Sequence, residues 1–399
     1  MTATWEPLLS PGTALTDARM FGEPNTDVST AADPRPGMTT VAGAPPARPD
    51  SGTAPARPAG RPRRTLLASG WSRAGGLLLA VAVLAVVAVC SIAFGSKPIP
   101  FGTVWDALWH NDGSNDHLIV RDLRVPRTLL GLGVGAALGL AGAIMQGVTR
   151  NPLADPGILG VDAGAALAVV LAIHAFSVTT LGGYVWFAFG GAALASAAVY
   201  LLGSLGRGGA TPVKLALAGA ALSALLRSIS SAVLLLDVET LDQFRFWLAG
   251  SLAGRGPDIV AGTAPFVVAG IVMALLSART LNTLSLGDDV ARALGVRVQL
   301  ARATSSLAVV VLCGAATAAA GPIGFVGLTV PHVARAICGP DYRWILPWSL
   351  VLAPTLLLGA DTLGRVVARP GEIEVGVITA FVGAPFFIAL VRRRKLASL

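Results

Sequence analysis

The stretch that decides the fold of this chain is Gly321-Pro322-Ile323-Gly324-Phe325-Val326-Gly327-Leu328-Thr329-Val330-Pro331-His332-Val333-Ala334-Arg335. Three glycines at a spacing of three lie between two prolines in a long apolar tract, which predicts close backbone approach and a break between two helices. Inside a membrane, irregular backbone is tolerated only where protein or a water-filled cavity surrounds it. The stretch therefore predicts a buried break at the functional centre of a membrane domain. The alternative is a site of helix–helix packing alone, since small residues at close spacing are common in membrane bundles.

The composition is that of a polytopic membrane protein. Of the 399 residues 54% are hydrophobic and only 13% are charged, and the mean hydropathy is +0.69. The basic residues behind the net charge of +8 lie in short clusters between apolar runs, a pattern typical of topology determinants and not of a nucleic-acid partner. The cysteines, at 90, 313 and 338, fall in or at the end of apolar spans at spacings that favour neither a metal site nor a structural disulfide.

Apolar runs of roughly 20 residues, the length that an α-helix needs to cross the hydrocarbon core, recur along the chain. They predict an all-α membrane domain over residues 71–399, with about ten spans: Gly75–Phe94, Leu129–Val148, Ile158–Val178, Tyr184–Leu205, Val213–Leu236, Ile259–Leu276, Ala303–Ala320, a short one within Ile323–Cys338, Ile345–Leu363 and Val375–Val391. Residues 1–70 lack apolar periodicity and are predicted to form a disordered cytoplasmic tail. The first apolar run begins after Trp71, too late and too long for a cleaved signal peptide.

Basic residues near the ends of the spans predict the orientation. The side that carries the run Arg392–Lys395 and the loop 279–302 has about twice as many bases as the other side. We therefore predict a multi-pass membrane protein with both termini and this loop in the cytoplasm. Within the loop, Leu284–Val296 alternates apolar and charged residues and is compatible with a short amphipathic helix, which is either an interfacial anchor or a docking element for a soluble partner.

Two further patterns describe the helices themselves. Asp155 suits a helix N-cap and Pro156 the first helical position, so that a tight turn is expected to lead directly into the third span. The run Gly131–Ala136 superficially resembles a dinucleotide-binding loop, but it lies inside an apolar helix with no preceding strand, and packing is the better interpretation.

No constellation of nucleophile, base or metal ligands indicates an enzyme, a cofactor site or a metal site. The chain has no G-x-x-x-x-G-K-[ST] motif and is not expected to bind ATP itself. An ion-coupled secondary transporter is expected to place carboxylates near mid-membrane, where this sequence has none. The middle of the fifth span instead contains Arg227, at a cost of about 2.5 to 3.5 kcal/mol. Either Arg227 faces a path for an anionic substrate, or it pairs with backbone carbonyls or snorkels.

Several motifs in a fixed order resemble the FecCD/BtuC family of ABC-transporter permeases, which serve ferric siderophores, haem and cobalamin. They are Arg124-Val125-Pro126-Arg127; Gln146; Arg150-Asn151-Pro152-Leu153-Ala154-Asp155-Pro156; Trp247-Leu248-Ala249-Gly250-Ser251; Leu286-Gly287-x-x-x-Ala291-x-x-Leu294-Gly295; the tract Gly321–Arg335; Asp361-x-x-x-Arg365; and Gly383-Ala384-Pro385-Phe386-Phe387. The resemblance covers residues 71–394. It implies a ten-helix permease that works with a second permease subunit, two ATP-binding subunits and an extracytoplasmic binding protein. A ferric siderophore is the expected substrate, with haem and cobalamin as alternatives.

The resemblance also implies roles for individual residues. Coupling to the ATP-binding subunits falls on Leu286, Gly287, Ala291, Leu294 and Gly295. Docking of the binding protein falls on Arg124, Arg127 and Arg365, although an ion pair of Arg365 with Asp361 four residues earlier is a competing role. Candidates for the path or gate are Arg227, Gly321, Pro322, Gly324, Gly327 and Pro331. The chain departs from the family pattern at Glu374, where the family usually has proline, which leaves the start of the last helix open.

Overall fold

The computed structural model describes residues 66–67, 69–110, 112–178, 180–206 and 209–395. In this part of the chain ten helices follow the predicted spans: α1 (Gly70–Ala93), α4 (Val125–Thr149), α5 (Val161–Phe176), α6 (Leu181–Ser204), α7 (Pro212–Leu236), α9 (Pro257–Leu276), α12 (Val298–Ala320), α13 (Val326–Cys338), α14 (Tyr342–Val367) and α15 (Val375–Lys395). Seven helices are long and apolar enough to cross a membrane, and α5, α13 and α15 are shorter apolar helices. The predicted fold class is confirmed. The predicted tail lies almost wholly outside the described residues and stays a prediction.

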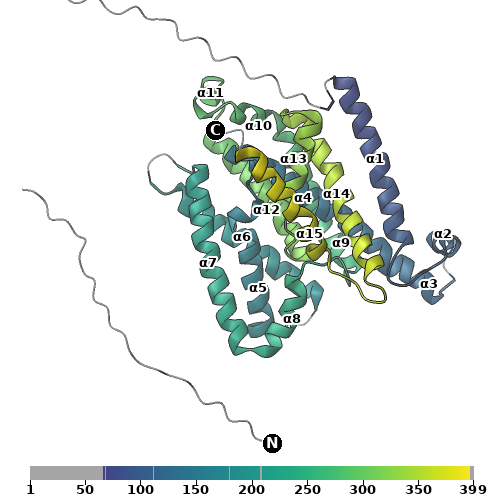
Figure 1. The fold of residues 1–399 in the computed structure, drawn as a ribbon. Coiled ribbons are helices and arrows are strands. Elements are labelled where there is room, and N and C mark those ends of the chain that lie inside the picture. The colour runs from purple at the N-terminus through teal and green to yellow at the C-terminus, as the bar shows by residue number, and fades with distance from the viewer. Residues whose placement is uncertain (1–65, 68, 111, 179, 207–208, 396–399) are drawn as a thin grey trace, which may run out of the picture. The chain divides into compact units, whose positions relative to one another are not determined.

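Helix α4 lies at the centre of the bundle and packs against α9, α12, α13 and α14 (Figure 1). Its many glycines bring backbones into contact. A Cβ added to Gly135 would lie 2.5 Å from the Cα atom of Pro354 in α14, and one added to Gly142 would collide with the carbonyl oxygen of Gly327 in α13. The run Gly131–Ala136 is therefore a packing surface, as predicted.

The short elements gather at the two ends of the bundle. One end has α2 (Phe101–Trp109), α3 (Asn115–Leu118), the π-helix η1 (Ile119–Arg124) and α8 (Val238–Leu248), and the other has α10 (Ala278–Ser285) and α11 (Asp288–Ala293) (Figure 1). The first described residues lie at the end of the bundle that has α10. There the amide of Leu67 donates to the carbonyl of Ile337, near the end of α13, over 3.0 Å. Helix α15 also ends there (Figure 1), as an even number of spans requires.

The third span differs from its prediction. Asp155 is an N-cap that accepts a hydrogen bond from the amide of Gly157, and Pro156 is the first helical residue, but they begin the separate 3-10 helix η2 (Pro156–Leu159). Helix α5 starts only at Val161, after Gly160 with its left-handed φ of 74°. The turn therefore leads into the span through an extra short helix, and the span is shorter than expected.

Candidate functional site

The stretch quoted first is a break between two helices, as predicted. Helix α12 ends at Ala320 and α13 begins at Val326. Both ends of the break have left-handed backbone, with a φ of 76° at Gly321 and 68° at Phe325. Residues with a side chain rarely adopt this conformation. Phe325 packs directly against Gly383 of α15, because a Cβ added to Gly383 would collide with the Cβ of Phe325. The shape of the break therefore depends on close contact with α15.

The loop after α8 lies between the break and the start of α15. The amide of Ser251 donates to the carbonyl of Ala320 over 2.7 Å, and the amide of Gly376 donates to the carbonyl of Gly250 over 3.0 Å. Gly250 has a φ of 69°, and a Cβ on it would collide with the carbonyl oxygen of Pro322. Three segments that are distant in sequence are thus joined by their backbones.

The three glycines of the break differ in their surroundings. A Cβ added to Gly321 would collide with the carbonyl oxygen of Trp247, and one on Gly327 would lie 3.0 Å from the carbonyl oxygen of Leu138. Gly324 is exposed, and a Cβ added to it would have no described atom within 4 Å. The expected close approach is confirmed at Gly321 and Gly327 and is wrong at Gly324, because the middle of the break faces outward. The gating role stays a prediction for Gly321, Pro322, Gly324, Gly327 and Pro331.

The arginines predicted to dock a binding protein are buried in this chain. Arg127 and Arg365 share the carboxylate of Asp361, which is itself 0% exposed, over 2.8 and 3.0 Å. The competing i,i+4 pair predicted for Arg365 is therefore present. Arg124 is only 4% exposed. It donates to the backbone carbonyls of Ile92 (3.0 Å), Ala93 (2.7 Å) and Lys97 (2.5 Å). These guanidinium groups hold α1, α4 and α14 together, and the docking role stays a prediction.

Glu372, in the loop before α15, extends this arginine cluster to the surface. Its carboxylate accepts from Nη1 of Arg127 over 2.7 Å and from the hydroxyl of Ser96 over 3.2 Å. Partial burial raises the pKa of Glu372, but the hydrogen bond and charge of Arg127 outweigh it and hold this pKa below its usual range. A cavity of about 320 Å³ lies beside the cluster and is lined by Arg124, Arg127 and Arg365.

The loop 279–302 forms two short helices, α10 and α11, with one apolar side inward and another outward. Ala291 is 0% exposed and packs with Leu284, whereas Leu286, Val290 and Leu294 are 61%, 46% and 63% exposed. The three exposed side chains lie in and beside α11, and we call them the coupling stripe after the role predicted from the sequence, which stays a prediction for Leu286, Gly287, Ala291, Leu294 and Gly295. Sequence reasoning missed Val290, although its spacing from Leu286 and Leu294 contained the signal. Gly287 and Gly295, with φ of 108° and 81°, flank α11.

An acidic residue anchors α11 to the bundle. The carboxylate of Asp288 pairs with Arg302 in α12 over 2.8 Å and with Arg150 after α4 over 3.1 Å. Arg302 is only 2% exposed. A displacement of α11 would therefore act directly on α12, and α12 is the helix that ends at the break.

Arg227 lies on the exposed side of α7, a helix whose apolar centre is only 11% buried within this chain. Asp162 in α5 lies within the range of its charge. The hydroxyl of Thr317, three residues before the end of α12 at the break, donates to Asp162 over 2.9 Å, so the prediction that no carboxylate lies near mid-membrane is wrong. Both of the roles considered for Arg227 stay predictions.

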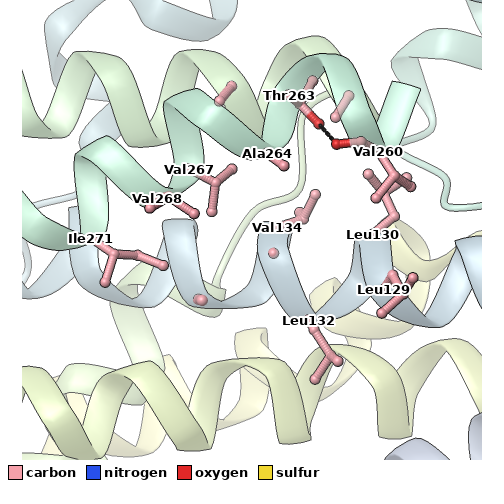
Figure 2. A pocket seen from close by; sticks show the side chains of 14 residues that line it. Leu129, Leu130, Leu132, Val134, Val260, Thr263, Ala264, Val267, Val268 and Ile271 are labelled. Atoms are coloured by element: carbon pink, nitrogen blue, oxygen red, sulfur yellow. Dashed lines mark hydrogen bonds between the residues drawn. The ribbon is translucent and has the colours of Figure 1, made fainter. Parts of the chain in front are cut away.

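A second cavity, of about 310 Å³, lies between α4, α9 and α12 (Figure 2). Its walls are apolar side chains such as Val134, Val267 and Ile271. The one hydroxyl among its lining residues, that of Thr263, is donated to the carbonyl of Ile259 over 2.7 Å. A polar or charged solute would find no free partner among these lining residues, so this cavity is unsuited to the path of such a solute.

The bundle of apolar helices, seven of them long enough to cross a membrane in the described part of the chain, is that of a multi-pass membrane protein. Residues 83–393 match the FecCD transport family, and the chain belongs to that family.

Individual relatives agree with this assignment. The chain is 49% identical over 320 residues to the ferric enterobactin transport system permease protein FepD of Escherichia coli, covering 80% of this chain and 94% of FepD. It is 38% identical over 323 residues to the hemin transport system permease protein HmuU of Yersinia pestis, covering 78% and 94% of the two chains. Among solved structures, an inward-facing conformation of a putative metal-chelate type ABC transporter matches with a TM-score of 0.71 and 30% identity, over 80% of this chain and 99% of that one.

Proposed function

We propose that this chain is the membrane-spanning permease subunit of an ABC importer and carries a ferric siderophore across the cytoplasmic membrane. The observation that carries the substrate class is the 49% identity to a ferric enterobactin permease over nearly its whole length. The 42% identity to YfiZ of Bacillus subtilis, which is named a probable siderophore transport system permease protein, supports the same class. Haem is the second candidate, supported by the 38% identity to the hemin permease. The relatives are permeases of ATP-driven importers, which does not favour the ion-coupled alternative.

The two ends of the bundle suit different partners. The exposed coupling stripe is apolar and offers a docking surface to an ATP-binding subunit. The opposite end, with the arginine cluster and α8, is where an extracytoplasmic binding protein would deliver substrate. In the proposed orientation both termini lie in the cytoplasm. The exposed side of α7 offers a surface to a second permease subunit.

In this assignment the chain itself catalyses no reaction and holds no cofactor. ATP is bound and hydrolysed by the partner subunits, and differential contacts shift the permease between inward- and outward-open states. The clamped break is suited to passing such a shift from the cytoplasmic helices to the opposite end.

Uptake by the reconstituted importer tests the proposal. Proteoliposomes that contain this chain and its ATP-binding and binding-protein partners are expected to accumulate radiolabelled ferric enterobactin when ATP is enclosed with the ATP-binding subunits. Hemin is the matched comparison, and its exclusive uptake would replace the siderophore by haem. Accumulation by this chain alone, under an ion gradient without ATP, would overturn the assignment to an ABC importer.

A further inference from the structure

A third cavity lies at the outer end, apart from the arginine cluster. It has a volume of about 550 Å³, within the range of roughly 300 to 1,000 Å³ typical of small-molecule sites. Its walls come from the start of α6, from α8, from the loop after α8 and from the residue before α15. The lining residues are Tyr184, Asp242, Gln243, Phe246, Trp247, Ser251, Ala253, Arg255 and Glu374.

Arg255 is the chemically unusual member of this wall. It is 4% exposed, and its Nε and Nη1 atoms hydrogen bond to no residue in the described part of the chain. The contrast is with the three arginines of the neighbouring cluster, which donate to carboxylates or carbonyls. A buried charge with unmet donors is costly. Burial also lowers the pKa of Arg255. An anion in the cavity would supply both the missing charge and the missing acceptors.

The rest of the wall favours an aromatic anion. The indole Nε1 of Trp247 and the amide oxygen of Gln243 are also buried and form no hydrogen bond with the described residues. Trp247 is buried and stacks on Phe244 with ring centroids 5.7 Å apart. Phe246, on the same wall, is 65% exposed and marks the open side. Aromatic side chains beside a cation and a free N–H suit a flat ring that carries a negatively charged oxygen.

Two carboxylates share the cavity and bear on the charge balance. Asp242 pairs with the exposed Arg245 over 3.2 Å, so its charge is already met. Glu374 acts on Arg255 through space, but the two form no ion pair within the described structure. Glu374 therefore stabilises the cation in part and leaves the Nε and Nη1 groups of Arg255 to another acceptor. Removing the Glu374 charge should strengthen the attraction of the cavity for an anion.

We propose that this cavity is a subsite for an aromatic oxyanion, a phenolate or aryl carboxylate, whose oxygen pairs with Arg255 while its ring lies on the Trp247 side. The proposal deepens the proposed function and rests on it where it assigns this group to the transported chelate. The site would hold one aromatic arm of the substrate at the outer end, next to the loop that is clamped to the break.

Salicylate binding to the assembled importer in lipid nanodiscs tests the subsite, with calorimetric titration as the readout. Salicylamide, the neutral analogue of similar shape, is expected to bind at least tenfold more weakly. Arg255→Gln should weaken salicylate binding at least tenfold, whereas the matched control Arg369→Gln, an exposed arginine of the same end that does not line the cavity, should change it less than twofold. Glu374→Gln should tighten it.

Several outcomes would overturn the subsite. They are equal binding of salicylate and salicylamide, binding that survives Arg255→Gln, or weaker binding in Glu374→Gln, which would show that Glu374 and Arg255 form a structural pair. If Arg255→Gln does not assemble, the comparison of the two ligands on the unmodified importer still decides. These measurements need no transport, so their failure is distinct from failure of ATP-driven uptake of ferric enterobactin.

Discussion

Removing the carboxylate of Asp361 should be among the most damaging conservative substitutions in this protein. Asp361 is 0% exposed and accepts from Arg127 over 2.8 Å and from Arg365 over 3.0 Å. In Asp361→Asn the side chain keeps its size, but two arginines that are at most 10% exposed lose their shared anion. Breaking a buried pair by removing one partner costs about 3 to 5 kcal/mol.

The remaining contacts set where in that range the loss should fall. Arg127 keeps Glu372 over 2.7 Å, and Arg365 keeps the carbonyls of Ser91 and Phe94 over 3.0 and 3.1 Å. Neither guanidinium is left without an acceptor, so we expect a loss in the free energy of unfolding near the lower limit, about 3 kcal/mol.

The matched control is Asp242→Asn, which breaks a pair with Arg245 whose side chains are 57% and 61% exposed. Exposed pairs contribute about 0 to 1 kcal/mol. Equilibrium unfolding of the purified chain in mixed micelles would measure both variants. A loss for Asp361→Asn no larger than that of the control would refute the reasoning, because it would mean that the buried arginines find other acceptors without cost.

Three other predictions follow from the contacts. Gly142→Ala should destabilise the chain by about 1 to 3 kcal/mol in the same unfolding assay, because its Cβ would collide with Gly327, whereas Gly324→Ala, in open space, should change stability by less than about 0.5 kcal/mol; equal effects would contradict the packing. Leu294→Asp puts a charge on the coupling stripe and should reduce co-purification of the ATP-binding subunit at least tenfold without loss of the folded permease, since Leu294 is 63% exposed; unchanged co-purification would exclude the stripe as the interface. Burial raises the pKa of Asp155 to about 6, against the hydrogen bond from the amide of Gly157 and with the help of the Asp162 carboxylate. Because this pKa is raised in the folded state, the free energy of unfolding should decrease as the pH rises from about 4 to 6. Asp155→Asn should abolish this decrease in the pH profile of unfolding, and a decrease that persists in the variant would contradict the assignment.

The positions of the long helices could be predicted because each crossing leaves an apolar run of fixed length in the sequence. The break was predictable for a related reason, since glycine and proline interrupt an apolar tract only where a helix must stop. The uncertain start of the last helix is settled at Val375, where the carbonyl of Glu374 accepts the amide of Val377 over 3.0 Å. A carbonyl can serve a helix start whatever the side chain, so a helix that starts at Val375 is compatible with Glu374 at this position.

Pairing between distant residues was beyond sequence reasoning. Arg127 and Asp361 are 234 positions apart, and a motif cannot tell a surface arginine from one buried on a partner in another helix. The spacing of the three glycines likewise does not show which of them contacts another helix, so the outward orientation of Gly324 could not be predicted. Helices α2 and α8 mix aromatic and charged residues in short segments, and such segments leave no run of the length that marks a span. Arg255 gave no signal, because a single arginine in a loop is usually solvated.

One helix has the connections that a transmitting element needs. At its first turns α12 holds Arg302 on Asp288 of α11 over 2.8 Å, and at its last residue the carbonyl of Ala320 accepts the amide of Ser251 over 2.7 Å. Its 23 residues span about 35 Å at 1.5 Å per residue, close to the thickness of the hydrocarbon core. Helix α12 thus connects α11 directly to the loop after α8. Because that loop also contributes Ser251 to the cavity of Arg255, the coupling stripe and the outer subsite are attached to opposite ends of the same helix.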